Sequence, residues 1–374
     1  MMRFIGFKQL VQGVLNISYH VASHLLRYCH DGFDLSPDPD TVLETISPRP
    51  SGTTIWTLGE PEQLNYDISI IIAAYNVVDV IVPCLESALT QKTDYSFEVI
   101  VIDDGSSDGT EVKLDKFIEG HCNLRVFHQT NRGIAAARNE GMRRARGAFF
   151  TFLDGDDMLE STFVQKCMDI QRQTDADCVT CDFSRISDNG NVVNTVVTHS
   201  GGETWGRCYR RSLWSNLCFP EGYRYEDSII KPFVLQCRTA EVHEPLYFYR
   251  LRPMSLSRAR GIKDIDSFWV TELLVEEAPF HGVNLEDSTF YTFVVEQLST
   301  YIRIRSLDRH VLPVIFASCA RLLRKMPQPE EEELSHAPLP VRDARYALIH
   351  GCYSLWKLVC HFSWISNALR TDKG

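Results

Sequence analysis

The middle of the chain alternates short apolar runs with stretches of helical periodicity. Four runs rich in β-branched and aromatic residues predict buried strands, at residues 68–76, 97–102, 124–127 and 148–153. Apolar residues at helical spacing between them predict helices that end near residues 89, 118 and 146. Strands that are apolar throughout and alternate with helices are typical of a parallel sheet covered on both faces, so the sequence predicts an α/β fold.

Polar clusters follow three of these predicted strands. Segments 74–76, 103–110 and 154–157 each begin where an apolar run ends. The carboxyl ends of parallel strands share one edge of a sheet, and ligands of such sheets bind at that edge. The three segments are therefore predicted to form one site.

The segment Asp154-Gly155-Asp156-Asp157 places three carboxylates directly after an apolar strand. One interpretation is an acidic turn, since Asp and Gly are ordinary turn residues. The other is a set of oxygen ligands for a divalent cation that itself holds phosphates. This segment alone supports the two interpretations equally. Asp157 is interpreted mainly as a helix N-cap, because residues 158–168 predict a helix.

Helices are predicted on both sides of this central domain. Residues 3–28 have the period of an amphipathic helix packed on the main domain; a helix lying on a membrane surface is the alternative, which Arg3 and Lys8 favour. Residues 34–65 are polar and predict a linker. The predicted domains are therefore 1–66, an N-terminal helix and linker; 67–260, the α/β domain; and 261–374, a helical region.

Periodicity in the helical region predicts several helices, at residues 268–275, 290–306, 311–325 and 346–369. The last of them is interrupted by polar residues, which excludes a bilayer span. It is predicted to pack on the central domain, with an interfacial membrane helix as the alternative.

Composition narrows the class of protein. The chain has 374 residues, of which 44% are hydrophobic and 23% charged, as in an ordinary soluble globular protein. Its formal net charge of -11 argues against a nucleic-acid-binding surface. Without a secretory signal, its 12 cysteines are interpreted as reduced thiols in a cytoplasmic protein. Cys178 and Cys181 lie in a predicted strand at 176–184, where a core pair is favoured over a redox or zinc site.

Four motifs, taken in order, resemble family 2 glycosyltransferases. They are Ala-Ala-Tyr-Asn at 73–76, Val-Ile-Asp-Asp-Gly-Ser-Ser-Asp-Gly-Thr at 101–110, Asn-Arg-Gly-Ile-Ala-Ala-Ala-Arg-Asn at 131–139 and Phe-Leu-Asp-Gly-Asp-Asp at 152–157. The resemblance covers about residues 67–258. It implies a GT-A fold, with a mostly parallel sheet flanked by helices, and inverting sugar transfer from a nucleotide-diphospho donor such as a UDP-sugar.

The resemblance also implies donor-binding roles. The first two motifs would bind the nucleotide, with the base recognised by an acidic acceptor, and Arg138 would face the nucleotide or its phosphates unless it is a surface charge of its helix. Asp154 and Asp156 would hold ribose and a Mn²⁺ or Mg²⁺ ion bridging the diphosphate. The implied donor-binding residues are Ala74, Tyr75, Asn76, Asp103, Asp104, Gly105, Ser106, Arg138, Asp154 and Asp156.

Acceptor-side residues follow further along the chain. Residues 205–211 resemble a Trp-x-Lys-Leu-Tyr-Arg-Arg segment that lines the acceptor side in the family, with Trp205, Arg207 and Tyr209 at the matching positions. Arg207 stands where the family has lysine and residue 208 is cysteine instead of an apolar residue, which leaves the acceptor's identity open.

Glu226 and Asp227 match the family's Glu-Asp motif. The resemblance makes Asp227 the base that takes the proton of the acceptor hydroxyl, with Glu226 orienting it. The alternative is that both acids only cap the helix that follows.

A strand beginning at residue 246 leads into a basic turn that also resembles the family. Arg250, Arg252 and Ser255 would meet the diphosphate when this loop closes, or the arginines are simply exposed.

Together these features predict a metal-dependent hexosyltransferase that modifies a hydroxyl of a glycan or lipid-linked acceptor in cell-surface polysaccharide synthesis. It would act in the cytoplasm, with peripheral contact to the cytoplasmic membrane face as an option. A non-catalytic binding or scaffold subunit would lack the Asp154/Asp156 or Glu226/Asp227 pair, and both are present. A nucleotidyltransferase would carry a glycine- and lysine-rich loop near the first strand, which this chain lacks.

Overall fold

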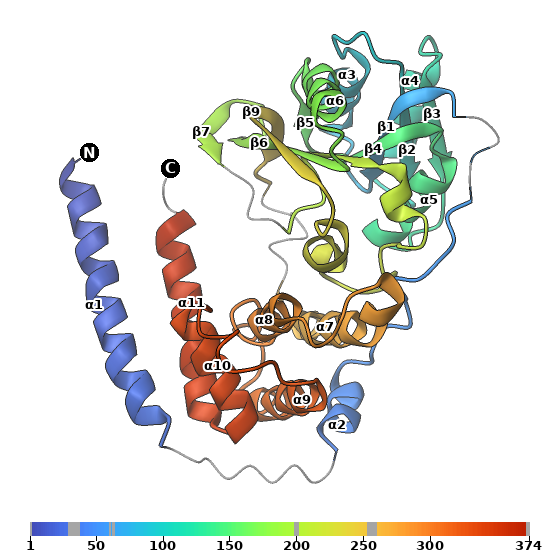
Figure 1. Ribbon diagram of the computed structural model, residues 1–374. Helices are drawn as coiled ribbons and strands as arrows, with labels where there is room; N and C mark the ends of the chain where they lie inside the picture. Colours follow the sequence, from blue (N-terminus) through green and yellow to red (C-terminus); the bar gives the residue numbers. More distant parts are fainter. Residues whose placement is uncertain are drawn as a thin grey trace. The chain divides into compact units, whose positions relative to one another are not determined.

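The computed structural model describes residues 2–28, 38–59, 61, 64–197, 202–252 and 260–371. The chain forms two compact units (Figure 1). One consists of residues 50–259, and the other combines residues 1–49 with residues 260–374. Ser255 falls outside the described residues.

The unit of residues 50–259 is built on a mixed sheet. Its first four strands are parallel and lie in the order β3-β2-β1-β4; they are β1 (Tyr66–Ala74), β2 (Phe97–Asp103), β3 (Leu124–His128) and β4 (Gly147–Asp154). Beyond β4 the order continues β8-β6-β9-β5, with β7 paired to β6; these strands are β5 (Met158–Leu159), β6 (Cys178–Ile186), β7 (Val192–Val197), β8 (Arg207–Arg210) and β9 (Thr239–Arg250). The predicted α/β fold with a mostly parallel sheet flanked by helices is confirmed.

Helices cover both faces of the parallel strands. Alternate residues of β1 point to opposite faces. Ile70 and Ile72 share a fully buried core with α3 (Ile81–Leu89) and α6 (Phe163–Thr174), and α4 (Thr110–Ile118) packs along β3. On the other face, α5 (Ile134–Arg144) lies so close that a Cβ on Gly141 would come within 2.3 Å of the Ile71 side chain. The absence of a side chain at Gly141 therefore sets the distance between α5 and the sheet.

The predicted helix at 158–168 is wrong at its start. Residues 158 and 159 instead form β5, paired antiparallel with β9, and α6 begins only at Phe163. Other boundaries also differ: the strand predicted to begin at 246 begins at Thr239, and the helix predicted at 290–306 ends at Gln297. Single-turn helices occupy Arg211–Trp214, Glu226–Ile229, Ile262–Ile265 and Ala278–His281, and a π-helix occupies Ile230–Val234.

The other unit is entirely helical in its described regular structure. It contains α1 (Met2–Leu26), α2 (Pro39–Ile46), α7 (Asp266–Glu277), α8 (Ser288–Gln297), α9 (Leu312–Lys325), α10 (Leu339–His350) and α11 (Tyr353–Thr371). The segment predicted as one helix at 346–369 is divided, because Gly351 adopts a left-handed φ of 76° and ends α10. None of the described helices is long and apolar enough to cross a membrane.

The first helix was predicted to pack on the central domain, and the structure shows it packed within the helical unit. In its described part, α1 contacts α11 of its own unit, where the rings of Tyr19 and Phe362 stand 4.1 Å apart. The Tyr19 hydroxyl donates to the Asp343 carboxylate at 2.9 Å. Periodicity identifies the packed face of such a helix but carries no information on its partner, which here is more than 300 residues away in sequence.

Candidate active site

The carboxyl ends of β1, β2 and β4 lie level at one edge of the sheet. The strand register pairs Ala74 with Asp103 and Ala73 with Asp154. The backbone N–H of Gly155 donates to the Ala73 carbonyl at 2.9 Å. A Cβ on Gly155 would lie 2.9 Å from that same oxygen, so glycine is what lets the acidic turn lie against β1. The three polar segments therefore do share one edge.

The loops after β1 and β2 are bound to each other. Asn76 has a positive φ of 51°; its N–H donates to Ser106 Oγ at 3.0 Å, and its Oδ1 accepts from Ser107 N at 2.8 Å. Gly105 has a φ of 72°, and a Cβ there would come within 2.7 Å of a backbone nitrogen. Tyr75 is 44% exposed, which makes its ring a free aromatic surface at this edge, whereas Ala74 is buried. The pair of loops is thus a fixed frame that presents one aromatic ring.

Asp104 organises the segment after β3. Its buried carboxylate accepts hydrogen bonds from Gln129 Nε2, Arg132 N and Gly133 N at 2.7, 2.9 and 2.7 Å. These bonds hold the residues that immediately precede α5. The structure therefore gives Asp104 a positioning contact within the protein, beside the donor contact that the resemblance implies.

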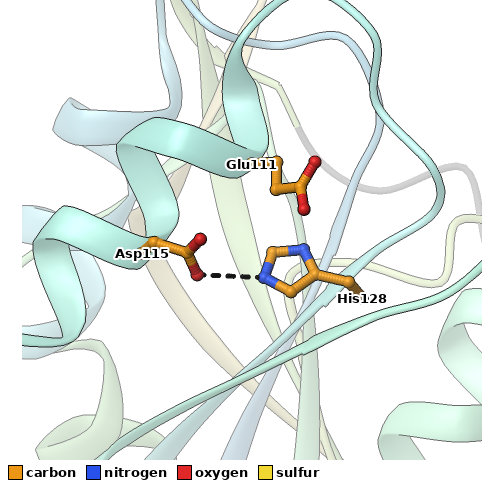
Figure 2. A group of neighbouring side chains, drawn as sticks. All are labelled: Glu111, Asp115 and His128. Atoms are coloured by element: carbon orange, nitrogen blue, oxygen red, sulfur yellow. Dashed lines mark hydrogen bonds and ion pairs between the residues drawn. The ribbon is translucent and has the colours of Figure 1, made fainter.

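Asp103 is linked to an exposed cluster on α4. Its buried carboxylate accepts from His128 Nδ1 at 2.9 Å, while His128 Nε2 lies 3.2 Å from Asp115. Possible metal-ligand atoms of Glu111, Asp115 and His128 lie within 4.8 Å of one another (Figure 2). Burial lowers the pKa of His128, but its hydrogen bonds to Asp103 and Asp115 outweigh burial and raise that pKa above its ordinary value. Since both ring nitrogens already have carboxylate partners, the cluster is best described as an ion-pair network.

Sequence reasoning missed this cluster. The four-residue spacing of Glu111 and Asp115 is a sequence signal for two acids on one helix face. The proximity of His128 depends on the packing of α4 against β3, which no local pattern reports.

Arg138 joins the two acidic motifs. It lies on α5 and is 4% exposed, so the alternative of a surface charge is wrong. Its guanidinium donates to Asp154 Oδ1 at 2.9 Å and to Glu226 Oε1 at 2.7 Å, and it lies over the Phe219 ring at 5.4 Å. These two carboxylates raise the pKa of Arg138 further, despite the opposing and larger effect of burial. A single buried cation therefore brings together motifs separated by more than 70 residues.

Asn139, the next residue on α5, binds the backbone of Phe219, whose ring lies beside Arg138. Asn139 Nδ2 donates to the Phe219 carbonyl at 2.8 Å, and Phe219 N donates back to Asn139 Oδ1 at 2.9 Å. Asn139 belongs to the motif at 131–139 but was not predicted as a site residue. Its role depends on a partner 80 residues away, which sequence spacing does not reveal.

Asp154 and Asp156 form a pair of acids at the sheet edge. Asp156 ion-pairs with Arg252 at 3.8 Å. Burial and then the neighbouring Asp154 raise the pKa of Asp156 to about 6, although Arg252 acts in the opposite direction. Crowded carboxylates at a partly buried edge are a donor set that suits Mg²⁺ or Mn²⁺, because hard cations take oxygen ligands and a cation would relieve the repulsion. The residues present therefore fit the metal that the resemblance implies.

Asp157 turns away from this pair into the protein. Its carboxylate accepts from the Tyr247 hydroxyl at 2.6 Å and from Arg250 N at 2.7 Å, and it is 1% exposed. Burial, followed by its two acidic neighbours, raises the pKa of Asp157 well above the ordinary value. The predicted N-cap role is wrong: α6 starts after Thr162, and Asp157 instead fastens the acidic turn to β9.

Glu226 and Asp227 lie in a single helical turn, Glu226–Ile229, which follows Tyr225 at a left-handed φ of 68°. Glu226 is engaged by Arg138 rather than by the start of a helix. Burial raises the pKa of Asp227 to about 7; the Glu226 carboxylate contributes in the same direction, and Arg138 opposes it. A carboxylate with a pKa near neutrality can take up a proton at physiological pH.

The three acceptor-side predictions have different surroundings. Trp205 is half-buried and stacks on Tyr247 and Tyr249, with ring centroids 4.6 and 5.4 Å apart. Arg207 is 1% exposed, and its Nε donates to Thr180 at 3.2 Å.

Tyr209 is fully buried among aromatic rings, and its hydroxyl donates to the Thr204 carbonyl at 2.8 Å. The structure thus places Arg207 and Tyr209 inside the protein, beneath the surface to which Trp205 belongs.

Arg250, the last residue of β9, and Arg252, which follows the strand, also differ from each other. Arg250 is 3% exposed, and its guanidinium donates to the carbonyls of Asp156 and Asp188 at 2.7 and 2.6 Å. Arg250 holds the backbone of the acidic turn from inside the protein, so the alternative of an exposed arginine is wrong for Arg250. Arg252 is the cation that the structure places beside the Asp156 carboxylate.

Comparison with known proteins places this arrangement in a family. The model for "Glycosyl transferase family 2" matches residues 69–234. An uncharacterized glycosyltransferase, EpsJ of Bacillus subtilis, is 31% identical over 283 residues, which cover 68% of this chain and 78% of EpsJ. Chondroitin synthase of Escherichia coli is 37% identical over 151 residues, but these cover 40% of this chain and only 21% of the synthase.

A solved structure shows the same fold. TarS of S. aureus, residues 1–349 in complex with UDP-GlcNAc, superposes with a TM-score of 0.64 at 19% identity, covering 80% of this chain and 92% of that one. The fold is accordingly of the GT-A type. Together with the match to EpsJ, these similarities establish that the chain belongs to glycosyltransferase family 2.

Proposed function

We propose that the protein is an inverting glycosyltransferase that moves a sugar from a UDP-sugar to a hydroxyl of a glycan or lipid-linked acceptor in cell-surface polysaccharide synthesis. The observation that carries this proposal is the Arg138 bridge. It sets the acids at the end of β4 beside the Glu226–Asp227 turn, through bonds of 2.9 and 2.7 Å. The choice of uridine nucleotide is supported by TarS, which shares the fold and binds UDP-GlcNAc.

The proposed reaction is a single displacement. The acceptor oxygen forms a bond to the anomeric carbon as the bond from that carbon to the diphosphate oxygen breaks, and the hydroxyl proton passes to Asp227. The pKa of Asp227, raised to about 7 by burial and by Glu226, suits a group that must be ionised before the reaction and protonated after it. Glu226 does not compete for this role, because Arg138 holds it as an ion pair.

The departing diphosphate needs positive charge. A divalent cation held by Asp154 and Asp156 would supply it by neutralising the leaving group. Asp154 is held in place by Arg138, and the Asp156 carboxylate lies beside Arg252. Among the described residues, we assign Arg252 to the diphosphate. The buried Arg250 instead holds the backbone of the acidic turn through its bond to the Asp156 carbonyl.

The donor nucleotide is assigned to the paired loops after β1 and β2. The exposed Tyr75 ring offers a stacking surface, and the left-handed Asn76 and Gly105 bring backbone close to the ligand. Ala74 and Asp103, which end β1 and β2, and Asp104 and Ser106, which follow β2, are assigned to the same donor site.

The test is donor hydrolysis across a panel of nucleotide sugars with Mn²⁺, for the wild-type chain and two variants. We expect Asp227→Asn to lower turnover by about 10²-fold or more, and Asp156→Ala to abolish the response to Mn²⁺. Asp94→Asn and Asp94→Ala are matched controls, because Asp94 is exposed and precedes β2 at the opposite edge of the sheet.

Each outcome has a distinct meaning. Full activity in Asp227→Asn would eliminate the proposed base, and an unchanged Mn²⁺ response in Asp156→Ala would eliminate the metal site. If the wild-type chain hydrolyses no donor and transfers no sugar, a non-catalytic binding subunit becomes the better interpretation.

A further inference from the structure

In its described part, helix α1 has one packed face and one exposed apolar face. Tyr19 and Ser23 are buried on the face toward α11. Four large apolar residues of the helix, Val14, Ile17, Val21 and Leu25, and Tyr28 in the turn that follows it, are between 57% and 75% exposed on the other side. Their spacings of three and four residues put them within roughly a quarter of the circumference of a helix with 3.6 residues per turn. We call these five residues the α1 stripe.

The orientation of α1 is fixed by specific bonds. Tyr19 donates to Asp343 Oδ2 at 2.9 Å, and Arg27 donates to Asp343 Oδ1 through its Nε at 3.1 Å. Asp343 lies on α10 and is fully buried. A helix held by a buried carboxylate cannot rotate freely to hide the stripe, so the apolar side chains stay exposed unless another surface covers them.

Helix α1, which carries the stripe, and α11, which contacts α1, contain no acids of their own, although the buried Asp343 of α10 pairs with Arg27. Residues 1–30 contain Arg3, Lys8 and Arg27 but no Asp or Glu, although the whole chain has a net charge of -11. Helix α11, which contacts α1, likewise has no Asp or Glu and carries Lys357 and Arg370. Lys357 is exposed. Two adjacent helices whose sequences contain no acids therefore lie beside an exposed apolar face in an otherwise acidic protein, with Lys357 as an exposed cation on one of them.

We propose that the α1 stripe docks on an anionic lipid surface, with α1 lying in the plane of the interface. An interfacial helix needs an apolar face to enter the acyl boundary and cations for the lipid headgroups, and this part of the chain supplies both. A second copy of the chain fits less well, because residues 1–30 contain three basic residues and no Asp or Glu, so two α1 helices joined through the stripe would present no complementary charge to each other. The inference is independent of the proposed function, since it rests on α1 and α11 alone.

The experiment is co-sedimentation of the full chain with vesicles, without donor or acceptor. Vesicles of mixed phosphatidylglycerol and phosphatidylcholine are compared with vesicles of phosphatidylcholine alone. The variant Ile17→Gln/Val21→Gln removes apolar area from the stripe without changing charge. Its control is Asn16→Gln/Ser18→Gln, which alters two exposed polar positions of the same helix.

We expect the wild-type chain and the control to bind the anionic vesicles. The partition coefficient of the stripe variant should be lower by about tenfold or more, because two apolar side chains are lost from the interface. Binding to phosphatidylcholine alone should be weak in all three proteins. Equal binding of the stripe variant would overturn the proposal, as would equal binding to both kinds of vesicle. A stripe-dependent dimer in sedimentation velocity without vesicles would assign the stripe to a second copy instead. Circular dichroism should be unchanged in both variants, since the substituted residues are exposed.

Discussion

At the scale of single residues, one arginine determines how the acidic groups of this site divide their work. Asp154 and Glu226 share the guanidinium of Arg138, while Asp227 is left to burial and to the charge of its neighbour. Asp157 is adjacent to Asp156 in sequence, but its carboxylate accepts hydrogen bonds from the Tyr247 hydroxyl and the Arg250 backbone N–H. Acids that are neighbours in the sequence therefore have different partners in the fold, which is how a site obtains both a base and a cation-binding pair.

The raised pKa of Asp227 gives a directional pH prediction. Because only the ionised carboxylate can accept the proton, kcat/KM should rise with pH through an inflection near the pKa of about 7. Glu226→Gln removes the like charge that helps to raise this pKa, so the inflection should move to lower pH. Initial rates measured over a pH series for both proteins test this.

A conservative change at an acid outside the site provides the control for that series. Glu140 is half-buried and pairs with Arg144, and Glu140→Gln should leave the inflection where it is in the wild-type protein. An inflection that does not move in Glu226→Gln would mean that Glu226 has no influence on the base.

At the scale of elements, α5 is the part of the fold that joins the two halves of the site. It packs closely on β1 through Gly141 and presents Arg138 and Asn139 to the acidic segments. The sheet therefore determines the position of α5. Helix α5, through Arg138, holds the Glu226–Asp227 turn.

This dependence predicts a large effect of removing the buried cation. Arg138→Met keeps most of the side-chain volume but leaves Asp154 and Glu226 without their shared partner. Breaking a buried ion pair by removing one partner costs about 3–5 kcal/mol, so the free energy of unfolding should fall by about that amount. Urea unfolding followed by tryptophan fluorescence measures the change.

Arg144→Met on the same helix is the matched control. Arg144 pairs with Glu140 at the surface, with side-chain exposures of 48% and 20%, so its loss should cost no more than about 0.5 kcal/mol. Equal destabilisation in the two variants would show that the bridge adds nothing beyond an ordinary surface pair.

The comparison of elements also shows what a sequence can and cannot predict here. The parallel strands were predicted correctly because each is rich in apolar residues, and the site edge was predicted because three of them end in a cluster of polar turn residues. The predicted start of α6 was wrong because Met158 and Leu159 form a strand with residues of β9 that lie about 90 positions further along the chain. The burial of Arg138 and the partner of α1 were missed for the same reason: long-range contacts outweigh local pattern.

At the scale of the whole molecule, the acidic turn should make folding stability depend on pH and on metal. The pKa of Asp156 is raised by burial to about 6 in the folded protein, from its ordinary value of 3.8. Above pH 6 the carboxylate is ionised in both states, and below pH 3.8 it is protonated in both. Between these values the folded state binds more protons, so this group's contribution to the free energy of unfolding falls as pH rises. Its magnitude is a few kcal/mol at most.

A divalent cation should offset that loss, because it binds the ionised pair only when the turn is folded. Saturation at 100 times the dissociation constant would add about 2.7 kcal/mol to the free energy of unfolding. We therefore expect Mn²⁺ to raise Tm at pH 7.5 relative to EDTA, and to have little effect near pH 4, where Asp156 is protonated. Asp156→Asn should be more stable than the wild-type protein in EDTA at neutral pH and should lose the Mn²⁺ response. A wild-type Tm that does not respond to Mn²⁺ at either pH would separate this acidic turn from metal binding, and identical pH curves for wild type and Asp156→Asn would show that the turn stores no electrostatic strain.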